Sequence, residues 1–166
     1  MEDRVSHLIT VSTPHRGSPY ADWCIKHLGL RLGALKFLTG LGLDLQGCID
    51  VTCQSCERFN TVTPDAPDVE YFSVSAARPW NRVPPFALHS HKIIYDLEGD
   101  NDGLVSVKSA AWGTHLETWP ADHWETINRR FRPAFLDDTV GDIKPYYVRL
   151  FDKIGVASAD DARLVS

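Results

Sequence analysis

The sequence predicts an α/β fold, because strand-like and helix-like segments alternate along the chain. Three short segments rich in β-branched and aromatic residues are typical of buried strands, namely residues 5–12, 69–75 and 116–119. Longer stretches with helical spacing of apolar residues separate them. The length of 166 residues suits one domain with a single core.

Composition excludes two classes of protein. The chain has 17 Lys+Arg and 22 Asp+Glu, a net charge of −5, and its basic residues are scattered, so nothing indicates nucleic-acid binding. No apolar run reaches the roughly 18–20 residues of a transmembrane helix. The acidic start at residues 1–4 differs from a signal peptide, which favours an intracellular location, cytoplasmic or mitochondrial.

The N-terminal elements are a strand at 5–12, which Pro14 ends, a proline-broken loop at 13–19, and a Leu-rich segment at 24–46. In that segment the apolar residues recur every three or four positions, as in an amphipathic helix. Its glycines each cost about 1 kcal/mol in a helix interior. Residues 24–46 are therefore either a plain core helix or a mobile, hinged segment.

The middle and C-terminal elements follow the same alternation. A short helix is expected at 50–59, and the apolar run 93–97 suits a strand or a helix. Helical spacing resumes at Trp124, with Ile127, Phe131 and Phe135 four residues apart, and residues 143–156 form another amphipathic pattern.

The cysteines do not indicate a metal centre. Cys48, Cys53 and Cys56 match the start of an iron–sulfur pattern, but the fourth ligand is missing, and no histidine follows at zinc-finger spacing. We interpret them as reduced thiols packed on helices and expect neither metal nor cofactor.

Asp102 and His123 are the residues best suited to catalysis. Each lies in a loop after an apolar segment, Asp102 in G-D-N-D-G-L-V and His123 in W-P-A-D-H-W. A carboxylate that orients an imidazole is what a serine nucleophile needs, and the order Asp then His is that of α/β-hydrolases. The acidic turn at 98–103 also resembles a calcium loop, but Ser109 stands where a closing Glu is required.

Three motifs in this order resemble the C-terminal portion of a triacylglycerol lipase of the α/β-hydrolase fold, as in the fungal and bacterial lipases. They are S-T-P-H-R-G-S at 12–18, N-D-G-L-V at 101–105 and D-H-W-E-T-I-N at 122–128. The resemblance covers roughly residues 4–132. It implies a mostly parallel sheet with flanking helices, Asp102 as catalytic acid, His123 as general base, and a lipid or ester substrate.

The departures from that family are equally informative. No G-x-S-x-G nucleophile elbow occurs, and in the family it precedes the T-P-H-R-G loop, so the first strands and the nucleophile are expected to be missing. The bacterial calcium site is not expected, because Arg129 occupies a ligand position, and Lys108 replaces a disulfide cysteine.

The resemblance also divides the chain. Residues 1–136 are expected to form the partial hydrolase domain, with a candidate lid at 24–56 that contacts lipid transiently through 24–46, and residues 137–166 a C-terminal helix and tail. Two functions stay open: part of an ester hydrolase, or an inactive truncated paralogue that binds lipid or a partner. In either case the strand at 5–12 is expected to be an exposed, aggregation-prone edge.

The remaining histidines are assigned no chemistry. We expect His15 and Arg16 to hold their loop by hydrogen bonds to backbone, and His115 to lie at a strand edge on the surface. His89 and His91 follow a proline-rich loop and are expected to have no partner.

Overall fold

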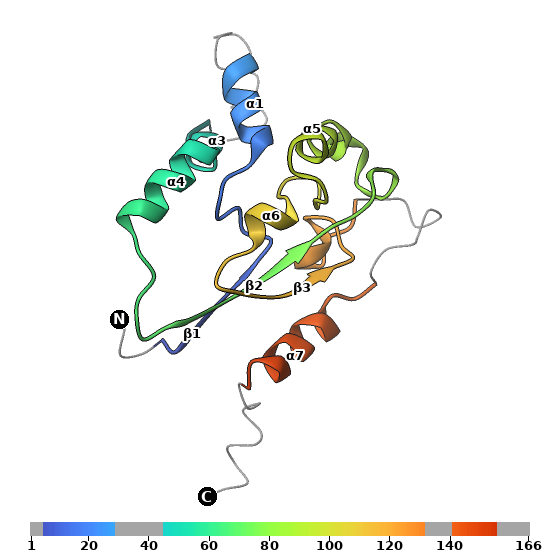
Figure 1. The fold of residues 1–166 in the computed structure, drawn as a ribbon. Helices are drawn as coiled ribbons and strands as arrows, with labels where there is room; N and C mark the ends of the chain where they lie inside the picture. The colour runs from blue at the N-terminus through green and yellow to red at the C-terminus, as the bar shows by residue number, and fades with distance from the viewer. Residues whose placement is uncertain (1–4, 29–44, 132–140, 156–166) are drawn as a thin grey trace, which may run out of the picture.

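Three parallel strands form the centre of the molecule, as the sequence predicts. The computed structural model describes residues 5–28, 45–131 and 141–155, and within them β1 (His7–Val11), β2 (Glu70–Ala76) and β3 (Thr114–Trp119) lie in the order β1-β2-β3. Val11 is aligned with Val74 in one pair, and Ser75 with Thr118 in the other. The parallel sheet with flanking helices (Figure 1) confirms the α/β fold class.

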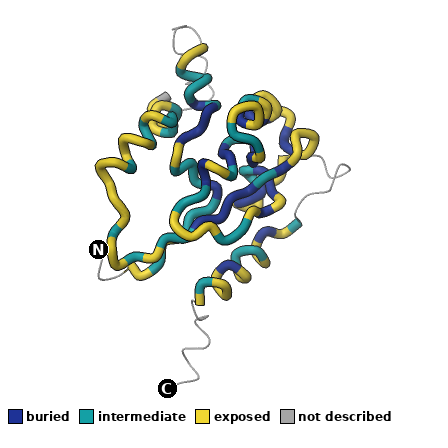
Figure 2. Tube along the Cα trace, in the orientation of Figure 1, coloured by how far each residue is buried: buried dark blue, intermediate teal, exposed yellow. Residues whose placement is uncertain are grey.

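The core lies on β2 and β3, where the strands end. Trp119 is only 1% exposed. The rings of Tyr146 and Tyr147 pack edge-on against it, with centroids 5.5 and 4.9 Å from that of Trp119. These tyrosines come from α7 (Lys144–Lys153), the amphipathic helix expected near the C-terminus. The buried core residues are Val74, Ala76, Trp119, Ala121, Ile143 and Leu150. Buried residues are concentrated along β2 and in the loops that follow the strands (Figure 2).

The other helices lie toward the carboxyl ends of the strands (Figure 1). They are α1 (Pro19–Leu28), α3 (Leu45–Asp50), α4 (Cys53–Val62), α5 (Leu88–Glu98) and α6 (Val107–Ala110), with 3-10 turns at Trp80–Arg82, Pro85–Ala87 and Glu125–Ile127. α1 contacts both α3 and α5. No helix in the described ranges is long and apolar enough to cross a membrane.

Some elements differ from the sequence expectation. The run 93–97 belongs to α5, so it is helix and not strand. The helix expected from Trp124 does not form as far as residue 131: over the described residues there, the chain makes only the 3-10 turn Glu125–Ile127, because Asn128 adopts a left-handed conformation with φ 61°. Phe135 of the predicted helix lies outside the described residues. The segment expected as one helix at 50–59 is two helices, and the hydroxyl of Thr52 caps the second by accepting the Ser55 N–H.

Much of the candidate lid lies outside the described residues. Positions 29–44, which make up most of the Leu-rich segment, are not described, so the choice between core helix and lid stays open. The proposed boundary at residue 136 also lies outside them, and the domain division stays a prediction.

Candidate active site

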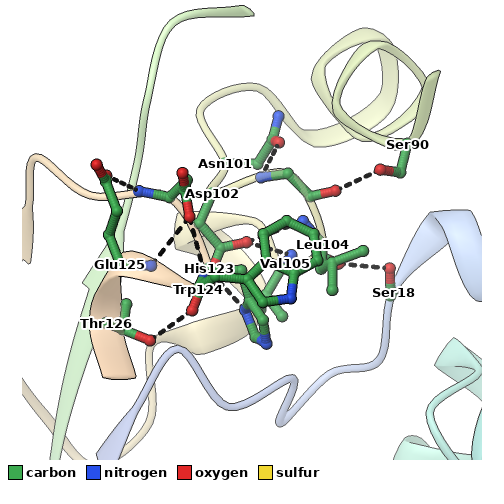
Figure 3. Close-up of polar contacts among 12 residues, drawn as sticks. Ser18, Ser90, Asn101, Asp102, Leu104, Val105, His123, Trp124, Glu125 and Thr126 are labelled. Atoms are coloured by element: carbon green, nitrogen blue, oxygen red, sulfur yellow. Dashed lines mark hydrogen bonds and ion pairs between the residues drawn. The ribbon is translucent and has the colours of Figure 1, made fainter. Parts of the chain in front are cut away.

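The loop between α5 and α6 meets the loop that follows β3 and brings Asp102 and His123 together (Figure 3). Oδ2 of Asp102 lies 2.8 Å from Nδ1 of His123. The Asp102 side chain is fully buried, whereas 32% of the His123 side chain is exposed. A buried carboxylate therefore holds an imidazole that is partly exposed.

Asp102 is fixed by its own loop. Its Oδ1 accepts the backbone N–H groups of Leu104 at 2.9 Å and Val105 at 2.7 Å, so each carboxylate oxygen has a separate partner. Asn101 supports the same turn by accepting the Gly103 N–H at 2.9 Å. Gly103 has φ +100°, a conformation that favours glycine. These bonds explain why the turn has the sequence N-D-G-L-V.

The backbone of His123 is held against the same loop. Its N–H donates to the carbonyl of Asp102 at 2.9 Å, and its carbonyl accepts the Thr126 hydroxyl at 2.6 Å. The turn that follows is closed by Asp122, whose Oδ1 accepts the N–H groups of Trp124 at 2.8 Å and Glu125 at 3.0 Å. Main-chain and side-chain bonds together fix the ring next to Asp102.

The electrostatics of the pair follow from this arrangement. Burial alone would lower the pKa of His123, but the hydrogen bond and negative charge of Asp102, helped by Asp122, outweigh it and raise the pKa above the ordinary value. When the imidazole is neutral, a hydrogen on Nδ1 donates to the carboxylate and leaves the lone pair on Nε2. The geometry thus suits a proton acceptor at Nε2.

A buried ion pair adjoins the site and was not predicted from the sequence. Arg78 and Glu125 lie 5% and 2% exposed, with Nε of Arg78 3.0 Å from Oε2 of Glu125. Arg78 follows β2 in a proline-containing stretch, where an arginine is normally exposed to solvent. Nothing in the sequence pairs it with Glu125.

The loop at 13–19 is tied to the site from the other side. Arg16 donates to the carbonyls of Lys108 and Ala111, as expected of a residue that holds the loop through backbone. His15 differs from expectation, because its Nε2 bonds the side-chain hydroxyl of Thr10 at 2.9 Å. Ser18 donates its hydroxyl to the carbonyl of Leu104 at 2.8 Å and so links this loop to that of Asp102.

The expectation for His89 and His91 is wrong. His91 is 3% exposed and donates from Nε2 to the carbonyl of Arg78 at 2.8 Å. His89 packs edge-on against Trp23 with ring centroids 4.7 Å apart. Both lie on α5, directly after the proline-rich loop. His115 is exposed on β3, as predicted, and its Nε2 lies 3.0 Å from the Ser75 hydroxyl.

No serine of the described ranges is hydrogen-bonded to Nε2 of His123. Ser73 and Ser75 bond within the sheet region, to Trp112 and to Thr118. Ser12 follows β1 with φ 49° and a buried hydroxyl that has no partner in the described part of the chain. It lies in T-V-S-T-P, which lacks the glycines of a nucleophile elbow.

The cysteines are free thiols, as expected. Burial raises the pKa of Cys53 to about 12 and also raises that of Cys56, so neither is an activated nucleophile. Over the ranges that the structure covers, no three His, Cys, Asp or Glu side chains are grouped so that they could hold a metal ion.

Comparison with known proteins shows similarity of this chain to a lipase. The chain is 34% identical over 162 residues to triacylglycerol lipase 2 of Saccharomyces cerevisiae, covering 89% of this chain and 48% of the relative. The chain thus spans about half the length of that curated relative. No protein-family model matches the chain.

Solved structures show the same fold. A Bacillus licheniformis lipase in its mature form matches with a TM-score of 0.57 and 24% identity, over 90% of this chain and 56% of that one. A metagenomic carboxyl esterase matches with a TM-score of 0.61 and 22% identity, over 73% of this chain and 37% of that one. Homology to the yeast lipase and the shared fold lead to one conclusion: the chain is homologous to about half of a triacylglycerol lipase and has part of an α/β-hydrolase fold.

Proposed function

We propose that this chain supplies the acid and the base of a lipase-type carboxylic ester hydrolase. In this proposal Asp102 orients His123, and His123 activates a serine that lies outside the 166 residues. The observation that carries it is the 2.8 Å bond between the buried Asp102 carboxylate and Nδ1 of the partly exposed His123 side chain.

The chemistry follows from the proton positions. Nε2 of His123 accepts the serine proton as the serine oxygen attacks the ester carbonyl, and Asp102 stabilises the imidazolium that forms. The imidazolium returns the proton to the leaving alcohol, which departs and leaves an acyl-enzyme. His123 then takes a proton from water as water attacks the acyl group. The imidazolium gives this proton to the serine oxygen as the acyl–serine bond breaks, which releases the carboxylic acid and regenerates the serine.

The substrate class proposed is a lipid ester. Its support is the similarity to a protein named triacylglycerol lipase and to a bacterial lipase of the same fold. The candidate lid at 24–56 and a lipid contact at 24–46 stay part of this proposal, since most of that segment is outside the described residues.

A non-catalytic lipid- or partner-binding protein is the second candidate, because no described serine reaches Nε2 of His123. The coding sequence directly upstream of Met1 separates the two. An in-frame strand followed by G-x-S-x-G supports the hydrolase, whereas the lack of such a segment supports the binding protein.

The hydrolase proposal has a kinetic test. The polypeptide that contains both the upstream serine and this chain should hydrolyse p-nitrophenyl esters, and His123→Gln should lower kcat/KM roughly 10⁴-fold or more. The matched control His7→Gln, outside the site, should leave it unchanged. Equal loss in both variants, or none in either, contradicts the role of His123.

Ser12 is the internal rival for the nucleophile, and it can be tested on the 166-residue chain alone. A fluorophosphonate probe should not label the chain, because the serine we propose is not in it. Labelling that disappears in both Ser12→Ala and His123→Gln would show an internal nucleophile and overturn this part of the proposal.

A further inference from the structure

The buried ion pair of Arg78 and Glu125 is bidentate. Nε of Arg78 lies 3.0 Å from Oε2 of Glu125, and Nη2 lies 3.2 Å from Oε1. The side chains are 5% and 2% exposed. Paired planar groups of this kind fix orientation as well as distance, because two parallel bonds resist rotation.

Glu125 transmits this constraint to the residue before His123. Its Oε2 accepts the backbone N–H of Asp122 at 2.8 Å, while Asp122 accepts the N–H of Glu125 at 3.0 Å. Asp122 and Glu125 therefore each accept the backbone N–H of the other, and the guanidinium of Arg78 binds the Glu125 carboxylate of this turn.

The main chain of Arg78 holds the other loop. Its N–H donates to the carbonyl of Asn101 at 3.0 Å, directly before Asp102. Its carbonyl accepts Nε2–H of His91 at 2.8 Å, which anchors the residue to α5. One residue thus contacts the acid's loop through backbone and the base's loop through its side chain.

The two loops need such a connection. They follow different strands, and a hydrogen bond of 2.8 Å between Asp102 and His123 tolerates only small displacements of either loop. We propose that Arg78, acting through Glu125, is a positioning residue that holds His123 against Asp102. This inference rests on the proposed function, in which the Asp102–His123 pair is the acid and base.

The test follows the His123 ring by NMR in the full 166-residue chain as pH is varied. In the double variant Arg78→Met/Glu125→Leu the ion pair becomes an apolar pair, so neither partner is left as an unpaired buried charge. We expect the pKa of His123 to fall by about one unit or more, a tenfold weaker proton affinity, because the ring leaves Asp102. Arg78 and Glu125 also act on the charge of Asp122, which helps to raise the His123 pKa, so a fall in pKa reports movement of the ring only together with a weaker Nδ1–H signal.

The matched control is the exposed pair of Lys92 and Asp96 on α5. Lys92→Met/Asp96→Leu should leave the His123 pKa unchanged. Glu125→Gln, which keeps an acceptor for the Asp122 N–H, should give an intermediate value. A second readout is the downfield Nδ1–H proton of His123, which should weaken in the Arg78→Met/Glu125→Leu variant and persist in the control.

Failure of this inference can be told apart from failure of the proposed function. If Asp102→Asn lowers the His123 pKa but Arg78→Met/Glu125→Leu and Glu125→Gln both retain the wild-type value, the positioning role is wrong and the acid–base pair stands. If Asp102→Asn has no effect, the pair itself is wrong. Should the double variant not fold cooperatively, Glu125→Gln alone decides: an unchanged pKa and Nδ1–H proton overturn the inference.

Discussion

Asp122 is a buried carboxylate directly before His123, and its charge is costly. It is 1% exposed, and burial raises its pKa to about 6. The charge of Glu125 also raises this pKa, whereas the hydrogen bonds from the backbone N–H groups of Glu125 and Trp124 lower it. Because the folded pKa exceeds the unfolded value, the folded state keeps a proton that the unfolded state releases. Stability should therefore fall as pH rises from about 4 to about 6.

The variant Asp122→Asn tests this cost. The amide oxygen can still accept the two backbone N–H groups, but no charge is buried. Relative to wild type, its free energy of unfolding should rise by about 1–3 kcal/mol between pH 4 and pH 7. Urea denaturation at several pH values measures it, and parallel pH profiles for the two proteins would contradict the burial argument.

At the residue scale, the sequence predicts local turns better than long-range partners. The turn around Asp102 is foreseeable, since Asn101 and Gly103 are residues that such a turn requires. The partner of Arg78 is 47 residues away, and the partner of His91 is 13 residues away, so neither follows from local pattern.

At the element scale, Gly17 fixes the loop after β1 against α4. Its φ is +82°, and a Cβ there would lie 2.5 Å from the backbone N and Cα of Cys53. Gly17→Ala should destabilise the chain by about 2 kcal/mol or more, through strain and the displacement of α4.

Gly47 in α3 is the matched control, since a Cβ there meets nothing within 4 Å. Gly47→Ala should be neutral or stabilise by up to about 1 kcal/mol, because alanine favours helix. Thermal unfolding of both variants measures the difference, and equal midpoints would contradict the close packing of Gly17 on α4.

Element type was predictable where one pattern dominated. β1 and β2 are dense in β-branched or aromatic residues and were identified directly, whereas the short run 93–97 suits either type until α5 is seen as a whole. The spacing of apolar residues after Trp124 predicts a helix, but Asn128 is left-handed and ends the 3-10 turn. Apolar spacing does not indicate which residue adopts a left-handed conformation.

At the scale of the whole molecule, β1 is an edge among the described strands, since it pairs with β2 only. Leu8 on this strand is 44% exposed. Unpaired backbone beside exposed apolar side chains promotes association between chains. The expected poor solubility of the isolated chain therefore stays a prediction.

Sedimentation measures this directly. The 166-residue chain should self-associate with rising concentration, and Leu8→Lys should reduce the association because a charge opposes strand pairing. Val148→Lys, at an exposed position of α7, should not. A monodisperse monomer that melts cooperatively at all concentrations would contradict the edge argument.

The parallel sheet and the order of its loops followed from the motifs. The carboxyl ends of parallel strands meet at one edge, which places His123 directly after β3. Asp102 follows α5, and its loop reaches the end of β2 through the bond from the Arg78 N–H to the Asn101 carbonyl. What could not be predicted is the tertiary support around them, because it depends on side chains that meet only after folding.

The pH titration of the His123 ring, in wild type and in Asp102→Asn, tests the central claim most directly. If Asp102 is the partner that orients His123, the wild-type pKa lies above about 6.5. In Asp102→Asn the pKa should be lower than in wild type, because burial is then opposed only by the charge of Asp122. The same pKa in both proteins would contradict the acid–base pair.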